Sequence, residues 1–596
     1  MRQKLKSTAG FLSKIIDPFP SMKSYWIMFF IFVIIYLFFY QGVFVNLMSY
    51  NRYDDEYYYI MAGNIGSLKW LGPYSSILLS KMPGFAIFLI FSIATHLPYL
   101  IVVGACYSIA IAFFLQCSMW LFSKAKIFSF LMGISLLFNP IFSNESRIYR
   151  NQLSAICLLI FIGALIALFN PNTKKYKKSS WIIMGFVSFL GTGFLFYTRE
   201  ETMLYYGMLG ISTTLFLLVF KKIATLGRNL YLIGCGLTGV IVVGLLISSL
   251  NYHFYGRFTV CEKTSVPFSS ALKAFQSVAD PDHNPQLPML SPSYNKIKQI
   301  AAVVPEFEKV ATIMCDSTFK SFKHSSTFLD RNTMEFCNID NCVIPPSHFE
   351  WYWISAVRKS GYYTNASDIA SYYKTLSQKI NEAITSGKLQ KRDILISAGP
   401  YFITKGDIPT IVKVLPHNYS RLFFTQSEFE SKFKNLAIRV SGKRNEINNL
   451  DFKKKLLNLK YLYLPKKTEM NDARESVYNK FWCFMVFLYS KLVVPLMHFA
   501  TPLALFAVIV GIFRKQWLTV FPILIIVAGY IAHFVLLSII DVVVGYRAST
   551  FRYFLPSYSL IIITPFLAIT TLVSPFLNQN KKRGKSKISF SILKKE

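Results

Sequence analysis

Charged residues are scarce in this chain of 596 residues. They make up 16% of it, whereas soluble domains carry about 25%. Hydrophobic residues make up 53%, and the mean hydropathy is +0.39. This deficit of charge, together with long apolar runs, excludes an ordinary soluble protein and indicates a polytopic α-helical membrane protein.

Acidic residues are the scarcest charged class, with 30 Asp and Glu against 64 Lys and Arg and a formal net charge of +34. Such an excess of positive charge can indicate nucleic-acid binding. Here the basic residues lie largely in short loops beside apolar runs and in the two tails, where the positive-inside rule and anionic lipids place them. We therefore expect membrane lipids, and no nucleic acid, as partners.

Several motifs that carry chemistry are missing. The sequence has no CxxC, HExxH, Walker loop, GxGxxG after a strand or GxSxG, and no metal-ligand spacing that predicts a site. These absences argue against the zinc, P-loop, dinucleotide-binding and α/β-hydrolase classes. Four of the nine cysteines fall in one long polar segment, where they permit either two disulfides or free thiols: Cys261, Cys315, Cys337 and Cys342.

A transmembrane helix needs about 20 apolar residues. The sequence predicts ten spans, at 25–47, 98–122, 127–142, 153–169, 181–197, 203–220, 229–254, 494–513, 517–540 and 552–573. The apolar stretch 83–97 is short, and we expect it to be an interfacial or re-entrant helix.

Ten spans place all the basic loops on one side. We expect this side to be cytoplasmic, together with the basic N-terminus 1–24 and the basic tail 576–596. The chain between them divides into an N-terminal membrane module 25–254 with a first outer loop 48–97, an extracytoplasmic α/β or mixed domain 255–480, and C-terminal helices 481–575. Within the outer domain, the spacing of apolar residues predicts a helix near 363–383.

Most acidic and mixed-charge clusters near the predicted membrane edges fall on the outer side. The most acidic is "DDE" at 54–56, directly after the first span. Neighbouring carboxylates close to a low-dielectric surface raise one another's pKa, which suits a general base that works near neutrality. Asp54 and Asp55 are therefore candidate bases. The alternative is a solvated acidic loop, or a structural partner for Arg52.

These residues carry a resemblance. An acidic pair after the first span, followed by an aromatic residue, resembles the membrane glycosyltransferases of the GT-C fold, which include the protein O-mannosyltransferases and the lipid A aminoarabinose transferases. "WLGPYSSILLSKMPGFAIFL" (70–89) looks like a juxtamembrane pattern of bacterial members, although Ala86 stands where a second proline is common. "YTREE" (197–201), "NYHFYGRF" (251–258) and "FRYFLPSYSL" (551–560) are similar to segments of the same group.

The resemblance implies transfer of a sugar from a polyprenyl phosphate to an acceptor hydroxyl on the outer face of a bacterial plasma membrane, usually with inversion. The acceptor would be a glycan, a lipid or a protein. The resemblance implies no certain cofactor, because some members use a divalent cation such as Mg²⁺ or Mn²⁺ and others do not. Asp55 and Glu56 are the candidate metal ligands.

The resemblance and the charge pattern together nominate substrate-binding residues. Lys81 corresponds to a lysine that contacts lipid phosphate in the aminoarabinose transferases, although an interfacial lysine that extends to lipid headgroups is the alternative. Charged side chains near the other outer span ends can grip phosphate, complete the site, pair with one another or anchor the interface. The candidates are Lys81, Arg552, Arg547, Tyr58, Glu145, Arg147, Arg199 and Glu200. His348, Glu350 and Trp351 either stack on sugar or belong to a packed aromatic core, which we favour.

Three other functions stay open. An O-antigen polymerase or ligase would share many spans and a large outer loop, but would depend on arginine and histidine in that loop. A transporter of lipid-linked sugar would need charge within its spans, where we expect almost none. A membrane scaffold with an outer interaction domain would make the acidic cluster incidental.

Overall fold

A computed structural model describes residues 18–41, 43, 54–76, 78–123, 125–143, 148–171, 177–199, 202–219, 223–282, 292–316, 327–329, 336–338, 346–398, 401–433, 472–544 and 551–592. Within these ranges, nine helices are long and apolar enough to cross a membrane. They are α2 (Met22–Tyr40), α5 (Tyr99–Ser118), α6 with α7 (Lys126–Leu137 and Pro140–Ser143), α8 (Arg150–Ala167), α9 (Lys178–Thr198), α11 (Ile223–Tyr255), α21 (Asp472–His498), α23 (Trp517–Val544) and α24 (Phe551–Ile592). The prediction of a polytopic helical membrane protein is confirmed.

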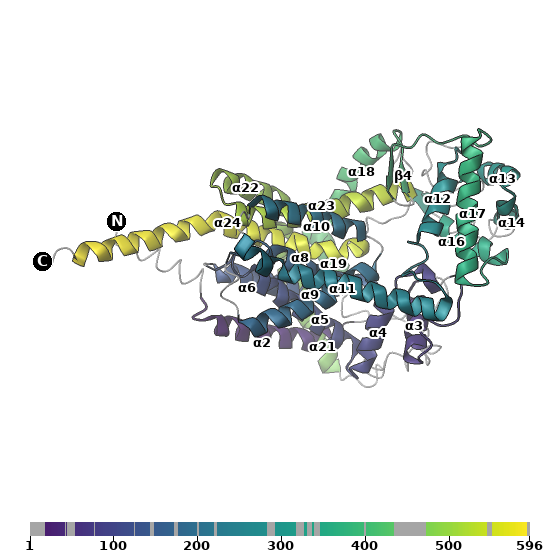
Figure 1. Cartoon of the computed structure of the whole chain (residues 1–596). Helices are drawn as coiled ribbons and strands as arrows, with labels where there is room; N and C mark the ends of the chain where they lie inside the picture. The colour runs from purple at the N-terminus through teal and green to yellow at the C-terminus, as the bar shows by residue number, and fades with distance from the viewer. Residues whose placement is uncertain are drawn as a thin grey trace.

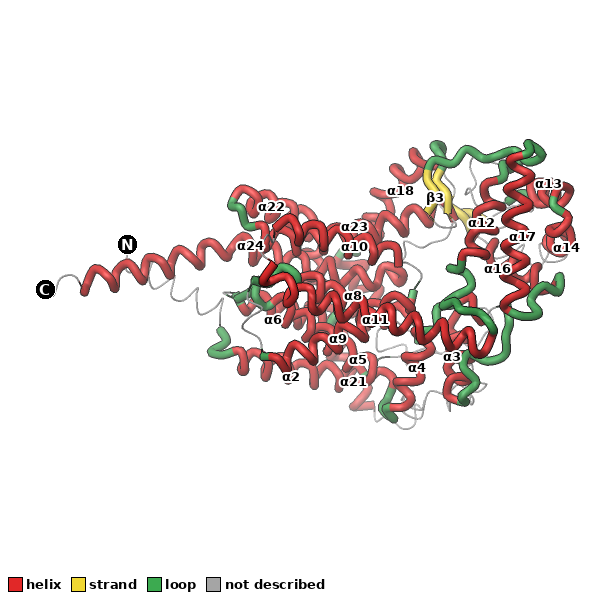
Figure 2. Tube along the Cα trace, viewed as in Figure 1, coloured by secondary structure: helices red, strands yellow, loops and turns green. Residues whose placement is uncertain are grey.

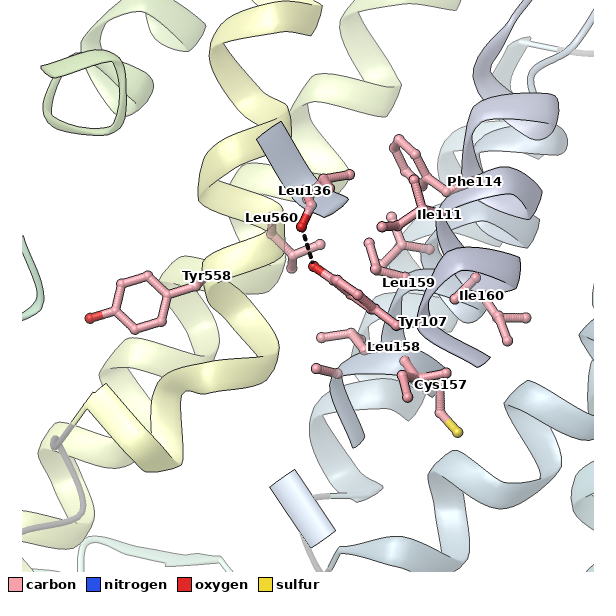
Figure 3. Packing of buried hydrophobic residues seen from close by; sticks show 14 of the residues in the cluster. Tyr107, Ile111, Phe114, Leu136, Cys157, Leu158, Leu159, Ile160, Tyr558 and Leu560 are labelled. Carbon is pink, nitrogen blue, oxygen red and sulfur yellow. Dashed lines mark hydrogen bonds between the residues drawn. The ribbon is translucent and has the colours of Figure 1, made fainter. Parts of the chain in front are cut away.

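The long helices form one bundle (Figure 1). Tyr107 of α5 donates a hydrogen bond to the carbonyl oxygen of Leu136 in α6 at 2.9 Å, among apolar side chains of α5, α8 and α24 (Figure 3). Small residues let α9 and α11 approach closely, because an added Cβ at Gly193 would lie 3.0 Å from the carbonyl carbon of Gly239. Large apolar side chains on the outside of the bundle are exposed, as expected for a lipid-facing surface.

The predicted span 203–220 corresponds to α10 (Thr202–Val219), whose described apolar stretch, Leu204–Leu217, is shorter than the nine others. This helix packs mainly against α23, where an added Cβ at Gly529 would lie 2.5 Å from Cε of Met208. Two of its rings also contact α8 and the turn that follows it. The ring of Tyr205 lies 6.1 Å from that of Phe161, and the ring of Phe216 lies 6.2 Å from that of Phe169.

The predicted span 494–513 is wrong in extent. Its residues are divided between the end of α21 and α22 (Ala500–Phe513), and the long apolar stretch is Val477–His498. Phe481 stacks on Phe39 at the end of α2, whereas Thr501 bonds to Tyr530 midway along α23 at 2.8 Å. The predicted boundary at 480/481 therefore falls inside α21. The sequence misled because Lys480 and Lys491 interrupt the apolar run.

The first loop folds into α3 (Asp54–Gly66), the 3₁₀ turn η1 (Leu78–Ser80) and α4 (Gly84–Ala94). With 11 residues, α4 is about 16 Å long at 1.5 Å per residue, which is too short for a hydrocarbon core of about 30 Å. The stretch 83–97 therefore forms no spanning helix, as its length predicted.

A separate helical unit, here called the polar domain, lies at one end of the bundle (Figure 2). It consists of α12 (Val266–Ser277), α13 (Tyr294–Val303), α14 (Pro305–Asp316), α16 (Pro346–Lys359) and α17 (Ala366–Thr385). Trp353 is fully buried at its centre, with ring centroids of Phe275 and Tyr373 at 5.4 and 6.0 Å. The predicted helix near 363–383 is α17, and Asn365 caps it by accepting from the backbone N–H groups of Ser367 and Asp368.

Strands are few in the described part of segment 255–480. β1 (Thr327–Leu329) pairs antiparallel with β2 (Phe336–Asn338), and β3 (Ile396–Ala398) pairs antiparallel with β4 (Tyr401–Ile403). The described residues thus form helices and two short hairpins, so the α/β alternative predicted for this segment is not what they form. The side chains of Cys337 and Cys342 lie outside the described residues, and the disulfide hypothesis stays a prediction.

The last described part of that segment packs on the bundle. Asn418 in α18 (Asp407–Leu422) donates to Asp541 of α23 at 2.9 Å. Phe429 in α19 (Gln426–Phe433) stacks on Tyr489 of α21 with centroids 5.6 Å apart. The segment predicted as one outer unit therefore contributes to two packed cores.

Candidate functional site

Two hydrogen bonds join the loop between α3 and α4 to the end of α11. The Nε1–H of Trp70 donates to Oδ1 of Asn251 at 2.7 Å, and the hydroxyl of Tyr255 donates to the carbonyl oxygen of Gly72 at 2.8 Å. The motifs "WLGPY" and "NYHFYGRF" lie about 180 residues apart in the sequence, as the separation of the Trp70–Asn251 pair shows. The fold makes them one contact.

Gly72 allows this loop to turn. Its φ of +109° is in the region that favours glycine, and an added Cβ would lie 2.8 Å from Cγ of Asn64. The Asn64 side chain occupies that space because its Nδ2 donates to the carbonyl oxygen of Leu71 at 2.8 Å.

Lys81 lies where the loop meets the polar domain. Its Nζ is 4.9 Å from the ring centroid of Trp351 on α16, and Nζ of Lys263 is 4.9 Å from the same ring. Lys263 also forms an ion pair with Glu350. Cation–π attraction strengthens as the cation leaves water, and Lys81 is only 6% exposed. This burial does not fit a lysine that extends to lipid headgroups.

The loop continues into α4, which begins against the end of α9. An added Cβ at Gly84 would overlap the carbonyl oxygen of Tyr197 and lie 2.8 Å from its carbonyl carbon. "KMPG" (81–84) and "YTREE" (197–201) are therefore in contact. Tyr58 is fully buried nearby, with its ring 5.2 Å from Phe85 and 6.5 Å from Tyr149, which precedes α8.

Arg199 ties α9 to α8 and α24. It is 2% exposed, and its Nη1 donates to Oδ1 of Asn151 and to the carbonyl oxygen of Tyr553, both at 3.2 Å. Its guanidinium carbon lies 5.9 Å from the centroid of the Tyr553 ring. "YTREE" thus touches the start of "FRYFLPSYSL".

The acidic residues Asp54, Asp55 and Glu56 are the first three residues of α3. Carboxylates are favoured in the first turn of a helix, which explains why the helix begins there. Their side chains lie outside what the structure describes, so the hypotheses of a base and of a metal ligand stay predictions. The described side chains contain no group of three His, Cys, Asp or Glu that could hold a metal ion.

The structure brings Lys81, Tyr58 and Arg199 to one end of the bundle. Arg552 is the second residue of α24, next to Tyr553, but its side chain is not described, and neither is that of His348. The predicted site residues Glu145, Arg147, Glu200 and Arg547 lie outside the described residues altogether. Glu350 and Trp351 contact the two lysines, while the centre of the aromatic core is Trp353.

Sequence reasoning missed several buried polar groups. Asn151 is fully buried beside Arg199, and Glu262, five residues after Arg257, lies under the polar domain. We expect almost no ionisable group within the spans, and His533 is an exception. It falls inside the stretch Trp517–Val542 and bonds through Nδ1 to Oγ of Ser557 at 2.6 Å. A lone buried histidine gives no periodic signal, so only the packing identifies it.

The contacts that the α3–α4 loop and α4 make with α9, α11 and α16 lie at one end of the molecule. α3, α4 and the end of α11 lie next to the polar domain in Figure 1, at the end of the bundle opposite the last turns of α24. The candidate site therefore consists of a loop held between a membrane bundle and a helical cap, with one buried cation in the loop, Lys81, and one in the bundle, Arg199. No protein-family model, curated protein or solved structure matches the chain.

Proposed function

We propose that this protein is a GT-C-like membrane glycosyltransferase that moves a sugar from a polyprenyl phosphate to an acceptor hydroxyl. The observation that supports this proposal is the convergence of four separate motifs on one site. "WLGPY" contacts "NYHFYGRF", "KMPG" contacts "YTREE", and "YTREE" contacts "FRYFLPSYSL". These are the motifs that resemble the bacterial members of that fold, and a shared site gives a reason for them to occur in one chain.

The proposed reaction needs few groups. The acceptor oxygen attacks the anomeric carbon while the carboxylate of Asp54 or Asp55 takes the hydroxyl proton, a contribution typically worth about 10²- to 10⁴-fold in rate. The bond between the anomeric carbon and the phosphate oxygen breaks, and the polyprenyl phosphate leaves. Lys81 and Arg199 are the buried cations that would stabilise the departing phosphate.

We place the reaction on the outer face of a bacterial plasma membrane, with both termini cytoplasmic, because the basic loops require that side. The polar domain would then be extracytoplasmic and cover the site. The ring centroid of its Trp351 lies 4.9 Å from Nζ of the proposed phosphate-binding lysine, so the domain would help to enclose the sugar phosphate. The acceptor would be an envelope glycan, a lipid or a protein.

The test compares envelope glycans by mass spectrometry in a deletion strain complemented with different variants at matched membrane abundance. Wild type restores one sugar-sized mass, and the double variant Asp54→Asn/Asp55→Asn does not. Glu382→Gln changes an exposed carboxylate on α17 and is the matched control that restores the mass. If the double variant restores the glycan as fully as wild type does, the acidic pair is not the catalytic base.

One observation favours a second candidate, a transporter of the lipid-linked sugar. His533 is 3% exposed inside a membrane-spanning stretch, and ionisable groups there often serve transport. Purified protein in detergent separates the two functions, because a transferase forms product without a sealed membrane and a transporter does not.

A further inference from the structure

The carboxylate of Glu262 is buried between the bundle and the polar domain. Its Oε1 accepts a hydrogen bond from the hydroxyl of Tyr74 at 3.2 Å and one from Nη1 of Arg257 at 3.3 Å, and its side chain is 2% exposed. Arg257 in turn donates through Nη2 to Oγ of Ser265 at 3.1 Å. The carboxylate thus joins the first loop to the connection between α11 and the polar domain.

The backbone of Glu262 makes a second tie to the same loop. Its N–H donates to the carbonyl oxygen of Leu79 at 2.6 Å. Glu262 therefore holds the loop at two points, Tyr74 and Leu79. Lys81 lies two residues after Leu79. Lys263, the residue that follows Glu262 in the chain, lies over the indole ring of Trp351, as Lys81 does.

We propose that Glu262 is the positioning residue that holds the α3–α4 loop, and through it Lys81, against the polar domain. Its part in holding the loop stands on geometry alone, while the benefit to substrate binding rests on the proposed function. A fixed lysine binds phosphate better because the side chain and loop are ordered before the ligand arrives. Displacement of such a group by about 1 Å can cost about 100-fold in rate.

The charged and titratable groups that act on Glu262 come from three elements. Arg257 precedes it, Tyr74 comes from the loop, and Tyr363 and Tyr373 come from the polar domain. Burial raises the pKa of Glu262 to about 7, although Arg257 and the hydrogen bond from Tyr74 lower it. Burial also raises the pKa of each of the three tyrosines, which stay neutral near pH 7. Glu262 is therefore the group that changes charge.

The direction of the pH effect follows from linkage. If the loop opens, water reaches Glu262 and its pKa returns toward the ordinary value of 4.5. The closed loop is then most favoured below pH 4.5, and opening becomes easier as the pH rises to about 7. The opening equilibrium should increase by up to about two orders of magnitude over this window.

Hydrogen–deuterium exchange of the full-length protein in nanodiscs tests the proposal, with variants compared at the same pH. Glu262→Ala removes the acceptor and should speed exchange at 71–80 by at least about tenfold at pH 4.5, where the wild-type loop is most firmly closed. The difference from wild type should shrink toward pH 8, because alanine does not titrate. Glu262→Gln keeps a neutral acceptor, so it should match wild type at pH 4.5 and exchange more slowly than wild type at pH 8. Tyr74→Phe removes only one donor and should give a smaller increase. Glu382→Gln is the control and should not change exchange of the loop.

Unchanged loop exchange in both Glu262→Ala and Tyr74→Phe would overturn the proposal, and so would a Glu262→Gln variant with the pH dependence of wild type. Binding of a short polyprenyl monophosphate measures the consequence at Lys81, and Glu262→Ala should weaken it at least about fivefold. If wild type binds no polyprenyl phosphate, the proposed function fails, while the exchange data still decide whether Glu262 holds the loop.

Discussion

Gly84 gives the sharpest test of how the site is held together. An added Cβ would overlap the carbonyl oxygen of Tyr197 and lie 2.8 Å from its carbon, whereas ordinary contacts begin near 3.4 Å. Gly84→Ala must therefore push α4 away from α9. Overpacking of this kind costs about 1–3 kcal/mol. Because Lys81 lies three residues before Gly84, the displacement also moves the proposed phosphate ligand, so transfer should fall more than stability does.

The assay pairs a thermal midpoint in detergent with a transfer rate measured well below that midpoint. Gly207→Ala is the matched control, because Gly207 is exposed in the middle of α10 with nothing within 4 Å of an added Cβ. That change should leave stability the same or raise it by up to about 1 kcal/mol. If Gly84→Ala unfolds at the same temperature as Gly207→Ala and keeps the wild-type rate, α4 and α9 are not in the contact described.

Three further predictions concern the same region. Asn251→Ala leaves the Nε1–H of Trp70 and the carbonyl oxygen of Thr259, which lies 2.6 Å from Asn251 Nδ2, without these hydrogen bonds. The substitution should lower the free energy of unfolding by about 2–4 kcal/mol, read from thermal midpoints. A loss below about 0.5 kcal/mol would contradict the buried contact between Asn251 and Trp70. The free energy of unfolding should fall by up to about 3 kcal/mol as the pH rises from 4.5 to 7, because Glu262 must ionise while buried. Thermal midpoints of wild type and Glu262→Gln at pH 5 and pH 8 check this prediction. It is refuted if the midpoint changes with pH equally in the two proteins. Asp54→Asn/Asp55→Asn should abolish transfer and leave the free energy of unfolding, read from the thermal midpoint, within about 1 kcal/mol of the wild-type value; a larger loss of stability would point to a structural role.

Helix composition explains how much of the fold was predictable. Apolar runs near 20 residues identified most of the membrane helices, and the period of apolar residues identified α17. The errors fall where charge interrupts an apolar helix. Lys480 and Lys491 lower the mean hydropathy of α21, so its apolar stretch was not recognised as a span. Hydropathy averaged along the sequence cannot separate a charged residue at an interface from one that ends a span.

The site was predictable only in its parts. The motif resemblance, together with the charged residues at the span ends, nominated Lys81, Tyr58 and Arg199. It gave no signal that Asn251 pairs with Trp70, or that Glu262 lies against Tyr74. Such pairs join residues that are more than 180 positions apart, and no local pattern encodes a contact between distant segments.

Composition and hydropathy alone determined that this protein is a helical membrane protein, because every backbone polar group in lipid must be satisfied within a helix. The tertiary structure decided which polar groups meet. Two lysines over one indole ring and a buried glutamate met only when α11 brought the polar domain over the end of the bundle. The physical reason is that burial and hydrogen-bond partners depend on packing between segments, which the order of residues along a single helix does not specify.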